Sequence, residues 1–207
     1  MIASLPMYDW QELAPAHDAL WVQIHQALTS AGLPAPDRLD REIGLWEAWE
    51  NPELLLGQTC GMPYRTRLHD HVRLVGTLDY GLPDSPAGFY YSELVVRADE
   101  PARLSDITQL RLAYNSHDSQ SGWAAPQNFA AQRGERFTRT LPTGAHRESA
   151  LAVAEGRADI AALDAVTWRL IRRYMPDLAS ALRVIARTDT TPGLPLITAL
   201  TCDSGQI

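Results

Sequence analysis

Residues 146–176, HRESALAVAEGRADIAALDAVTWRLIRRYMP, decide the fold class. The first part predicts a helix that ends at Gly156, because glycine is a good helix stop. The apolar run IAALD (160–164) predicts a buried strand, and the segment after it predicts a helix that ends at Pro176. A helix, a buried strand and a further helix in direct succession are typical of α/β domains with mostly parallel sheets.

The same alternation of strands and helices extends over the rest of the chain. Helices are expected in 11–32 and 122–134, and strands in 2–7, 53–61, 72–80, 88–99, 111–115, 182–188 and after the turn TPGLP. A composition change near 97–105 divides this pattern, and we therefore expect two lobes. Lobe one comprises 1–96, with 195–207 returning to it, and lobe two comprises 97–194. A cleft between two such lobes is a common site for small ligands.

Composition and charge exclude several classes of function. The 207 residues are 45% hydrophobic and 21% charged, with a formal charge of −7, which argues against a nucleic-acid partner. All 18 basic residues are arginine, so Schiff-base, P-loop and kinase lysine chemistry is absent. No apolar run reaches the ~18 residues of a membrane span. The start, MIASLPMYDW, has no secretory pattern, so the protein is either cytoplasmic or given without its export segment.

Cysteine and histidine patterns offer little catalytic or metal chemistry. Cys60 and Cys202 could form one disulfide, which sequence cannot decide, and they are too few for a cysteine-rich zinc site. In HDH, His69 and His71 alternate within a segment that looks like a solvated turn, so we expect no metal there. A hydrolase using Ser121 and a histidine is the enzymatic alternative, but the G-x-S-x-G pattern of a nucleophile elbow is missing. We expect no cofactor and no enzymatic activity.

The stretch AYNSHDSQSGWAAPQNFAAQ (113–132) is the main candidate for a binding site. A strand ends in small polar residues, and a helix is expected to start at Ser119, Gln120, Ser121 and Gly122. A helix start presents unpaired N–H groups and favours an anion. Serine hydroxyls add uncharged donors, and a glycine leaves room for close approach of a ligand. The alternative is a serine that caps the helix without any ligand.

Asp164, at the end of the strand IAALD, is a second candidate. Ligands of α/β domains bind at the carboxyl ends of strands. A carboxylate repels a fully ionised anion but accepts a hydrogen bond from a protonated P–OH, or pairs with an amine. Asp164 would thus select a protonation state or an amino substituent. The alternative is an N-cap for the helix that follows.

An ordered set of segments resembles one known family. LLLGQTCGMPY, GFYYSELVVRADE, RLAYNSHDSQSG, TGAHRESALAVAEGRADIAALDAVTW and RTDTTPGLPLITA are similar to the phosphate, phosphite and phosphonate-binding proteins of ABC importers. The resemblance implies a two-lobed type 2 periplasmic-binding-protein fold with the ligand in the cleft between the lobes. It implies capture of a small phosphorus oxyanion for import, periplasmic residence and an importer permease as partner. We expect a monomer.

The resemblance also implies roles for further residues. His146, at the start of a helix, would contact the oxyanion, and the positive helix end would favour its neutral form. Tyr8 and Tyr91 would close over the ligand, although an aromatic residue in a strand is often simply core. The alternative function is a binding or sensor module of the same fold, outside transport, for another small anion such as a sulfonate or a phosphorylated vitamin precursor.

Overall fold

The chain forms two compact units in a computed structural model, which describes residues 1–101 and 104–202. Unit 1 comprises Met1–Leu78 and the chain from Gly193 onward, and unit 2 comprises Asp79–Pro192. Residues 79–96, which sequence placed in lobe one, thus belong to unit 2. The reason is strand pairing, because Ser92–Arg97 pairs on both sides with strands of that unit. Residues 203–207 of the expected lobe one lie outside the described residues.

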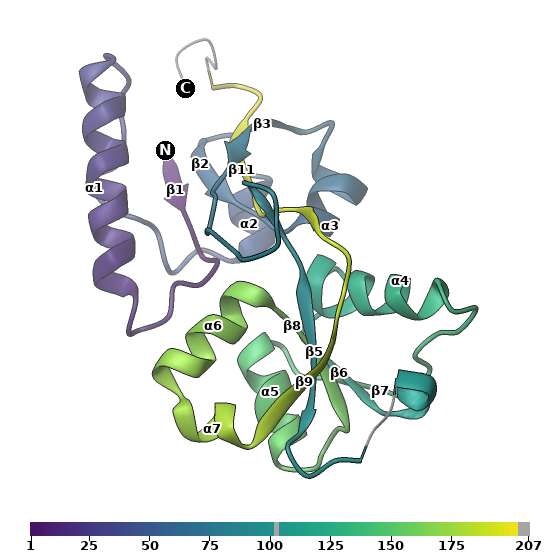
Figure 1. The fold of residues 1–207 in the computed structure, drawn as a ribbon. Coiled ribbons are helices and arrows are strands. Elements are labelled where there is room, and N and C mark those ends of the chain that lie inside the picture. Colours follow the sequence, from purple (N-terminus) through teal and green to yellow (C-terminus); the bar gives the residue numbers. More distant parts are fainter. Residues whose placement is uncertain (102–103, 203–207) are drawn as a thin grey trace. The chain divides into compact units, whose positions relative to one another are not determined.

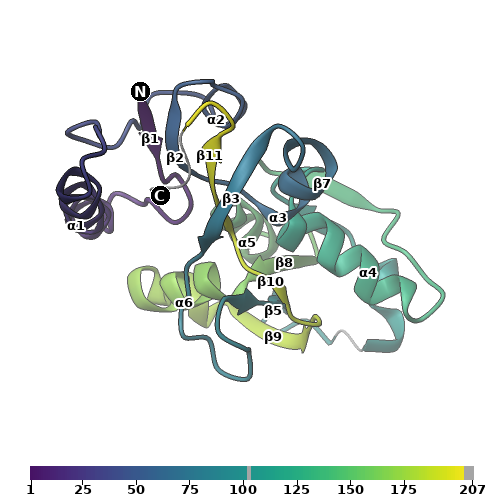
Figure 2. The ribbon, with the colours of Figure 1, turned by 90° about the horizontal axis from the view of Figure 1, so that it is seen from above.

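Unit 1 is built around a sheet with the strand order β1-β2-β11-β3, visible in Figure 2. Its helices and strands are, in chain order, β1 (Ile2–Ser4), α1 (Ala14–Ser30), α2 (Leu45–Trp49), β2 (Leu54–Gln58), α3 (Gly61–Pro63), the π-helical turn η1 (Tyr64–Leu68), β3 (Val72–Thr77) and β11 (Pro195–Ala199). Helix α1 and most strands lie where sequence predicted them, whereas α2 was not expected.

The elements of unit 1 pack in two apolar clusters. Trp21 and Leu28 of α1 pack with Ala3, Leu55 and Leu56 of the strands. The other cluster joins helix α2 and the turn η1 to strands β2, β3 and β11, and contains Trp49, Leu54, Leu68, Val72, Ile197 and Ala199. The buried tryptophans Trp21 and Trp49 are therefore core residues.

Unit 2 contains a larger sheet with the order β7-β6-β8-β5-β9 and a small ribbon of β10 and β4. Its elements are β4 (Phe89–Tyr90), β5 (Ser92–Arg97), the 3₁₀ helix η2 (Leu104–Gln109), β6 (Leu112–Tyr114), the π-helical turn η3 (Gln120–Ala124), α4 (Ala125–Ala131), β7 (Thr140–Pro142), α5 (His146–Ala154), β8 (Ile160–Asp164), α6 (Ala165–Tyr174), α7 (Pro176–Ser180), β9 (Leu182–Arg187) and β10 (Thr191–Pro192). The segment 146–176 thus forms the predicted helix, strand and helix.

Helices cover both faces of the unit 2 sheet, with α4 on one side and α5, α6 and α7 on the other (Figure 1). The face toward α4 is a cluster in which Phe129 and Ala130 pack with Leu94, Val96 and Ile160. Neighbouring residues of the strands, such as Val95 and Ala161, point to the opposite face and are also buried. Burial on both faces explains why β5 and β8 read as nearly continuous apolar runs.

The prediction of mostly parallel sheets is wrong for one strand in each unit. Strand β5 is antiparallel to β8 and β9, and β11 is antiparallel to β2 and β3. The pairs β1/β2, β6/β7 and β6/β8 are parallel. Strand β5 follows the short strand β4, and β11 follows the return of the chain from unit 2, so neither is reached through the crossover helix that a parallel neighbour needs.

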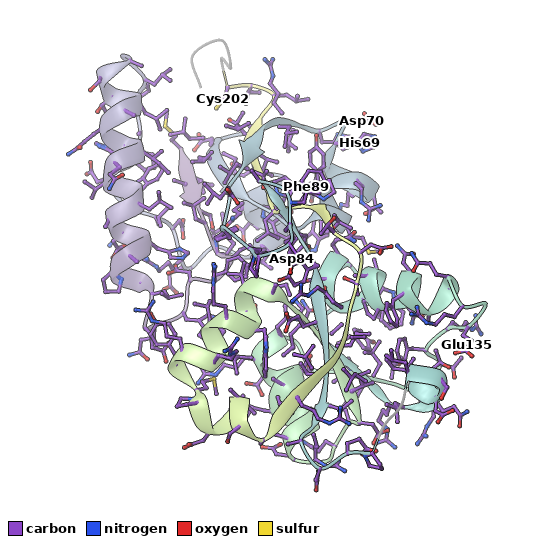
Figure 3. All side chains as sticks on the ribbon, in the orientation of Figure 1. His69, Asp70, Asp84, Phe89, Glu135 and Cys202 are labelled. Carbon is purple, nitrogen blue, oxygen red and sulfur yellow. The ribbon has the colours of Figure 1, made fainter. Side chains whose placement is uncertain are left out.

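Several features that the sequence pointed out lie outside the sheets. Cys60 and Cys202 are not joined by a disulfide in this structure. His69 and Asp70 project from an exposed turn before β3 (Figure 3). No group of histidine, cysteine and acidic side chains that could hold a metal occurs within residues 1–101 and 104–202. In the same ranges, no helix is long and apolar enough to cross a membrane.

Candidate functional site

One edge of the unit 2 sheet collects nearly all the residues that sequence singled out. Strands β7, β6 and β8 are parallel neighbours, so their carboxyl ends lie at the same edge. His146 follows β7, the loop to Ser119 follows β6, and Asp164 is the last residue of β8. Because β5 runs the other way, its first residue, Ser92, pairs with Asp164 at this edge. These residues therefore form one compact cluster at the carboxyl ends of parallel strands, where α/β domains bind their ligands.

The polar loop after β6 leads directly into a helical run. Ser119 has an extended backbone, and its Oγ accepts a hydrogen bond from the Gly122 N–H at 3.0 Å, which is an N-cap. The turn η3 continues without a break into α4, with Pro126 in the first turn of α4, where proline is tolerated. Ser119, Gln120 and Ser121 are each 4% exposed. The predicted helix start is confirmed, and Ser119 caps it.

His146 joins this loop to the end of β8. Its Nε2 lies 2.8 Å from Ser121 Oγ and 3.5 Å from Asp164 Oδ2. The imidazole side chain is 15% exposed and the Asp164 side chain 3%. Residues from three separate segments thus meet around one ring nitrogen.

Burial determines the charge of this histidine. Removal from water lowers the pKa of His146 below its ordinary value of 6.5, because the charged form loses its hydration. The Asp164 carboxylate and the backbone of Ala162 act in the opposite direction but do not outweigh burial. Near neutral pH the imidazole is therefore uncharged, with one N–H donor and one acceptor nitrogen.

Asp164 is the N-cap of helix α6, which is one of the two roles that the sequence suggested for it. Its Oδ1 accepts from the Thr167 N–H at 2.9 Å, and its Oδ2 accepts from Thr167 Oγ1 at 2.5 Å. These bonds compensate the cost of burying a carboxylate. They also hold Oδ2 in the direction of His146.

Gly122 has a different reason to be glycine from the one that sequence suggested. A Cβ at this position would overlap Asn115 Oδ1 and would lie 3.1 Å from His146 Cε1. The space beside its Cα is filled by the protein, and Asn115 Oδ1 itself is buried without a hydrogen-bond partner. The glycine therefore permits close packing of the loop against Asn115 and His146.

The two candidate tyrosines lie in different units. Tyr8 is half-buried in unit 1, just after β1, and has φ of +65°, a rare backbone conformation for a bulky residue. Tyr91 lies in unit 2 between β4 and β5 and is 3% exposed. The guanidinium carbon of Arg187 is 4.2 Å from the centre of its ring. Burial raises the pKa of Tyr91, with Arg187 opposing, so the phenol stays protonated.

Sequence reasoning left three supporting residues without a role. Ser92 Oγ donates to the Ser121 carbonyl at 3.0 Å, and Thr188 Oγ1 accepts from the Ser92 N–H at 2.9 Å. Thr167 completes the cap at Asp164. An aspartate N-cap accepts from a backbone N–H two or three residues later, and this was a usable signal for the place of Thr167. Ser92 and Thr188 gave none, because their place depends on the reversed strand β5.

Solved structures with the same fold include several binding proteins. A binding protein component of an ABC phosphonate transporter from Pseudomonas aeruginosa superposes with a TM-score of 0.71 at 18% identity, over 100% of this chain and 70% of the other. A protein of Xanthomonas citri bound to ATP superposes with a TM-score of 0.70 at 17% sequence identity, over 99% of this chain and 78% of the other. PhnD1 of Prochlorococcus marinus in complex with methylphosphonate superposes with a TM-score of 0.69 at 16% sequence identity, over 96% of this chain and 76% of the other. The expected two-lobed periplasmic-binding-protein fold is confirmed.

The family is established by sequence. No curated protein sequence matches the chain significantly. The family model of the periplasmic substrate-binding protein of phosphonate ABC transporters matches residues 56–204. This range covers most of the 207 residues and contains every part of the cluster at the edge of the unit 2 sheet. The chain therefore belongs to the family of periplasmic substrate-binding proteins of phosphonate ABC transporters.

Proposed function

We propose that this chain captures a phosphonate at the edge of the unit 2 sheet and delivers it to an ABC permease. The ligand's oxygens would be bound by the helix start at Ser119, Gln120, Ser121 and Gly122, together with His146. The observation that carries the proposal is the 2.8 Å contact between Ser121 Oγ and His146 Nε2 at the start of a helical run. In this contact a neutral hydroxyl and a neutral imidazole from distant segments share a hydrogen bond at a place that favours an anion.

Uncharged donors supply enough free energy for this task. A hydrogen bond to a charged oxygen contributes about 1.5–3 kcal/mol net. Three to five such bonds, less the cost of association, support a dissociation constant of roughly 1 μM, or about −8 kcal/mol. Hydroxyl and imidazole donors also release their ligand more readily than a paired arginine would, which suits a delivery protein.

Asp164 would set which form of the ligand is accepted. Its carboxylate lies 3.5 Å from His146 Nε2, beside the donors proposed for the anion. A second negative charge there is unfavourable, so a singly ionised phosphonate, with a P–OH that donates to the carboxylate, binds better than the doubly ionised form. Affinity should then fall as pH rises through the second ionisation of the ligand.

The remaining roles complete the proposal. Tyr8 and Tyr91 would contact the ligand, and the protein would act as a monomer in the periplasm, without a nucleic-acid partner. We infer no hydrolase activity from Ser121, His146 and Asp164. In serine hydrolases the serine and the acid bind opposite ring nitrogens. Here both approach Nε2, so Asp164 does not hold the ring as a base for Ser121.

Calorimetry on the purified chain tests the proposal. Phosphate, phosphite, methylphosphonate and 2-aminoethylphosphonate are titrated separately, and at least one should bind with a dissociation constant of about 1 μM or below. In the double variant Ser119→Ala/Ser121→Ala binding should be lost while the circular dichroism spectrum is kept. Ser105→Ala/Ser180→Ala, which replaces two exposed serines of unit 2, is the matched control and should bind like the wild type. A folded protein that binds none of the four compounds contradicts the proposal.

A further inference from the structure

The carbonyl of Ser121 lies in a helical turn that offers it no hydrogen-bond donor. In an α-helix this carbonyl would accept from the Ala125 N–H, but that N–H donates to the Gln120 carbonyl, because η3 is a π-helical turn. With π-helical spacing the donor for Ser121 would be five residues later, at Pro126, which has no N–H. The Ser121 carbonyl therefore depends on a donor from another part of the fold.

Ser92, the first residue of β5, supplies this donor. It is buried, and its Oγ donates to the Ser121 carbonyl at 3.0 Å. The other end of the same peptide group is the Gly122 N–H, which donates to Ser119 Oγ at 3.0 Å. The peptide plane that follows Ser121 is thus held at both ends. Since the Ser121 side chain projects from the backbone beside this plane, its orientation fixes the contact of Ser121 Oγ with His146 Nε2 at 2.8 Å.

The backbone of Ser92 is itself held on both sides. Its N–H donates to Thr188 Oγ1 at 2.9 Å, and its carbonyl accepts from the Thr188 N–H at 2.9 Å. On the other side it pairs with Asp164 in the register of β5 and β8. The reversed direction of β5 is what brings its first residue to the edge where the loop lies. Ser92 is therefore a rigid support beneath the peptide group that follows Ser121.

We propose that Ser92 is a positioning residue for anion binding, which keeps the Ser121 hydroxyl beside His146 and in place for an oxygen of the ligand. The inference rests on the proposed function, and it gives Ser92 no contact with the ligand itself. A merely structural role has a different consequence. In that case the Ser92 hydroxyl only satisfies a buried carbonyl, and its removal lowers the stability of the protein without changing how Ser121 binds.

Calorimetry with methylphosphonate tests the effect on binding. Ser92→Ala should bind this compound about tenfold more weakly than the wild type, because the Ser121 hydroxyl is no longer held toward the ligand. Ser121→Ala keeps the backbone donors of the helix start and should retain weak binding. Adding Ser92→Ala to Ser121→Ala should change the affinity by less than about twofold, because the side chain that Ser92 positions is already absent.

Two further variants complete the binding series. Thr198→Val in unit 1 also removes a buried hydroxyl that donates to a backbone carbonyl, that of Leu54 at 3.2 Å, and is the matched control. It should bind methylphosphonate like the wild type. Thr188→Val keeps the Ser92 hydroxyl but removes the acceptor of the Ser92 N–H, so it should weaken binding by a smaller factor of about two to five. It decides the question if Ser92→Ala does not fold.

Nitrogen NMR spectra of the imidazole rings give a readout that needs no ligand. The Nε2 resonance of His146, assigned by its absence in His146→Gln, depends on the hydrogen bond with Ser121 Oγ. In Ser92→Ala this resonance should move toward its position in Ser121→Ala, because both substitutions disturb the same contact. In Thr198→Val, which also loses a buried hydroxyl, it should stay in place.

The results separate the positioning role from the proposed function. The role is refuted, while the proposed function stands, if Ser92→Ala binds methylphosphonate like the wild type, or if it weakens binding equally with and without the Ser121 hydroxyl. An unchanged His146 resonance in Ser92→Ala refutes it as well. If wild-type protein shown to be folded by circular dichroism binds no methylphosphonate, the proposed function fails for this ligand, and the spectra alone decide whether Ser92 positions Ser121.

Discussion

Replacement of His146 by glutamine should remove a specific pH dependence of stability. In the folded protein burial lowers the pKa of His146, whereas in the unfolded chain the imidazole has its ordinary value of 6.5. Below that pH the unfolded chain binds a proton that the folded protein resists. The stability due to the neutral histidine is therefore complete above about pH 6.5 and is lost as the pH falls toward the lower pKa of the folded state.

The magnitude follows from proton linkage. One proton taken up only on unfolding changes the free energy of unfolding by at most about 1.4 kcal/mol per pH unit. The loss stops once the pH lies below the pKa of the folded state. His146→Gln cannot take up this proton, and its amide can still reach Ser121, so its stability curve should be flatter in this window.

Urea titrations of wild type and His146→Gln between about pH 5 and pH 8 measure the difference in slope. His71→Gln, which removes an exposed histidine of unit 1, is the control for loss of an imidazole elsewhere. Asp164→Asn is a second test variant. The Asp164 carboxylate raises the pKa of His146, so its removal should lower that pKa further, and the loss of stability with falling pH should then continue to lower pH. Equal slopes for wild type and His146→Gln would refute the reasoning.

Two further substitutions test the packing of the site. Gly122→Ala should lower the free energy of unfolding by about 1–3 kcal/mol, because its Cβ would overlap Asn115 Oδ1 and crowd His146; an unchanged urea midpoint would show that Asn115 moves aside without cost. Asp164→Ala should cost about 1–3 kcal/mol through the lost cap and the unsatisfied Thr167 hydroxyl, whereas Asp164→Asn should keep most of the cap; equal losses in the two variants would mean that capping is not the cause.

Local patterns were sufficient for the elements that lie in one unit and follow each other along the chain. The strand Ile160–Asp164 and its flanking helices were predictable because the apolar run, Gly156 and Pro176 are all local signals. The same holds for the helix start at Ser119, whose cap is a contact between neighbours. Strand β7 was missed because its three residues, Thr140–Pro142, have no apolar pattern of their own.

Distant contacts account for what sequence could not supply. Nothing in the run SELVVR indicates that β5 lies between β8 and β9 and runs against both, since its burial pattern would suit either direction. The reason for Gly122 also required coordinates, because it depends on a side chain seven residues earlier and on the His146 ring from another helix. The left-handed backbone of Tyr8 likewise has no local glycine or asparagine signal.

Capping and ligand binding, which sequence posed as alternatives for Ser119 and Asp164, are compatible in this geometry. The Ser119 hydroxyl accepts from the Gly122 N–H, and a hydroxyl that accepts still has its own proton to donate. The Asp164 oxygens accept from Thr167, and Oδ2 also lies 3.5 Å from His146 Nε2. In both cases the cap fixes the side-chain rotamer and so determines the direction in which the hydroxyl or carboxylate faces. A helix cap at the end of a strand is thus a means of aiming a polar group, and selection for binding can act on a residue that the fold already holds in place.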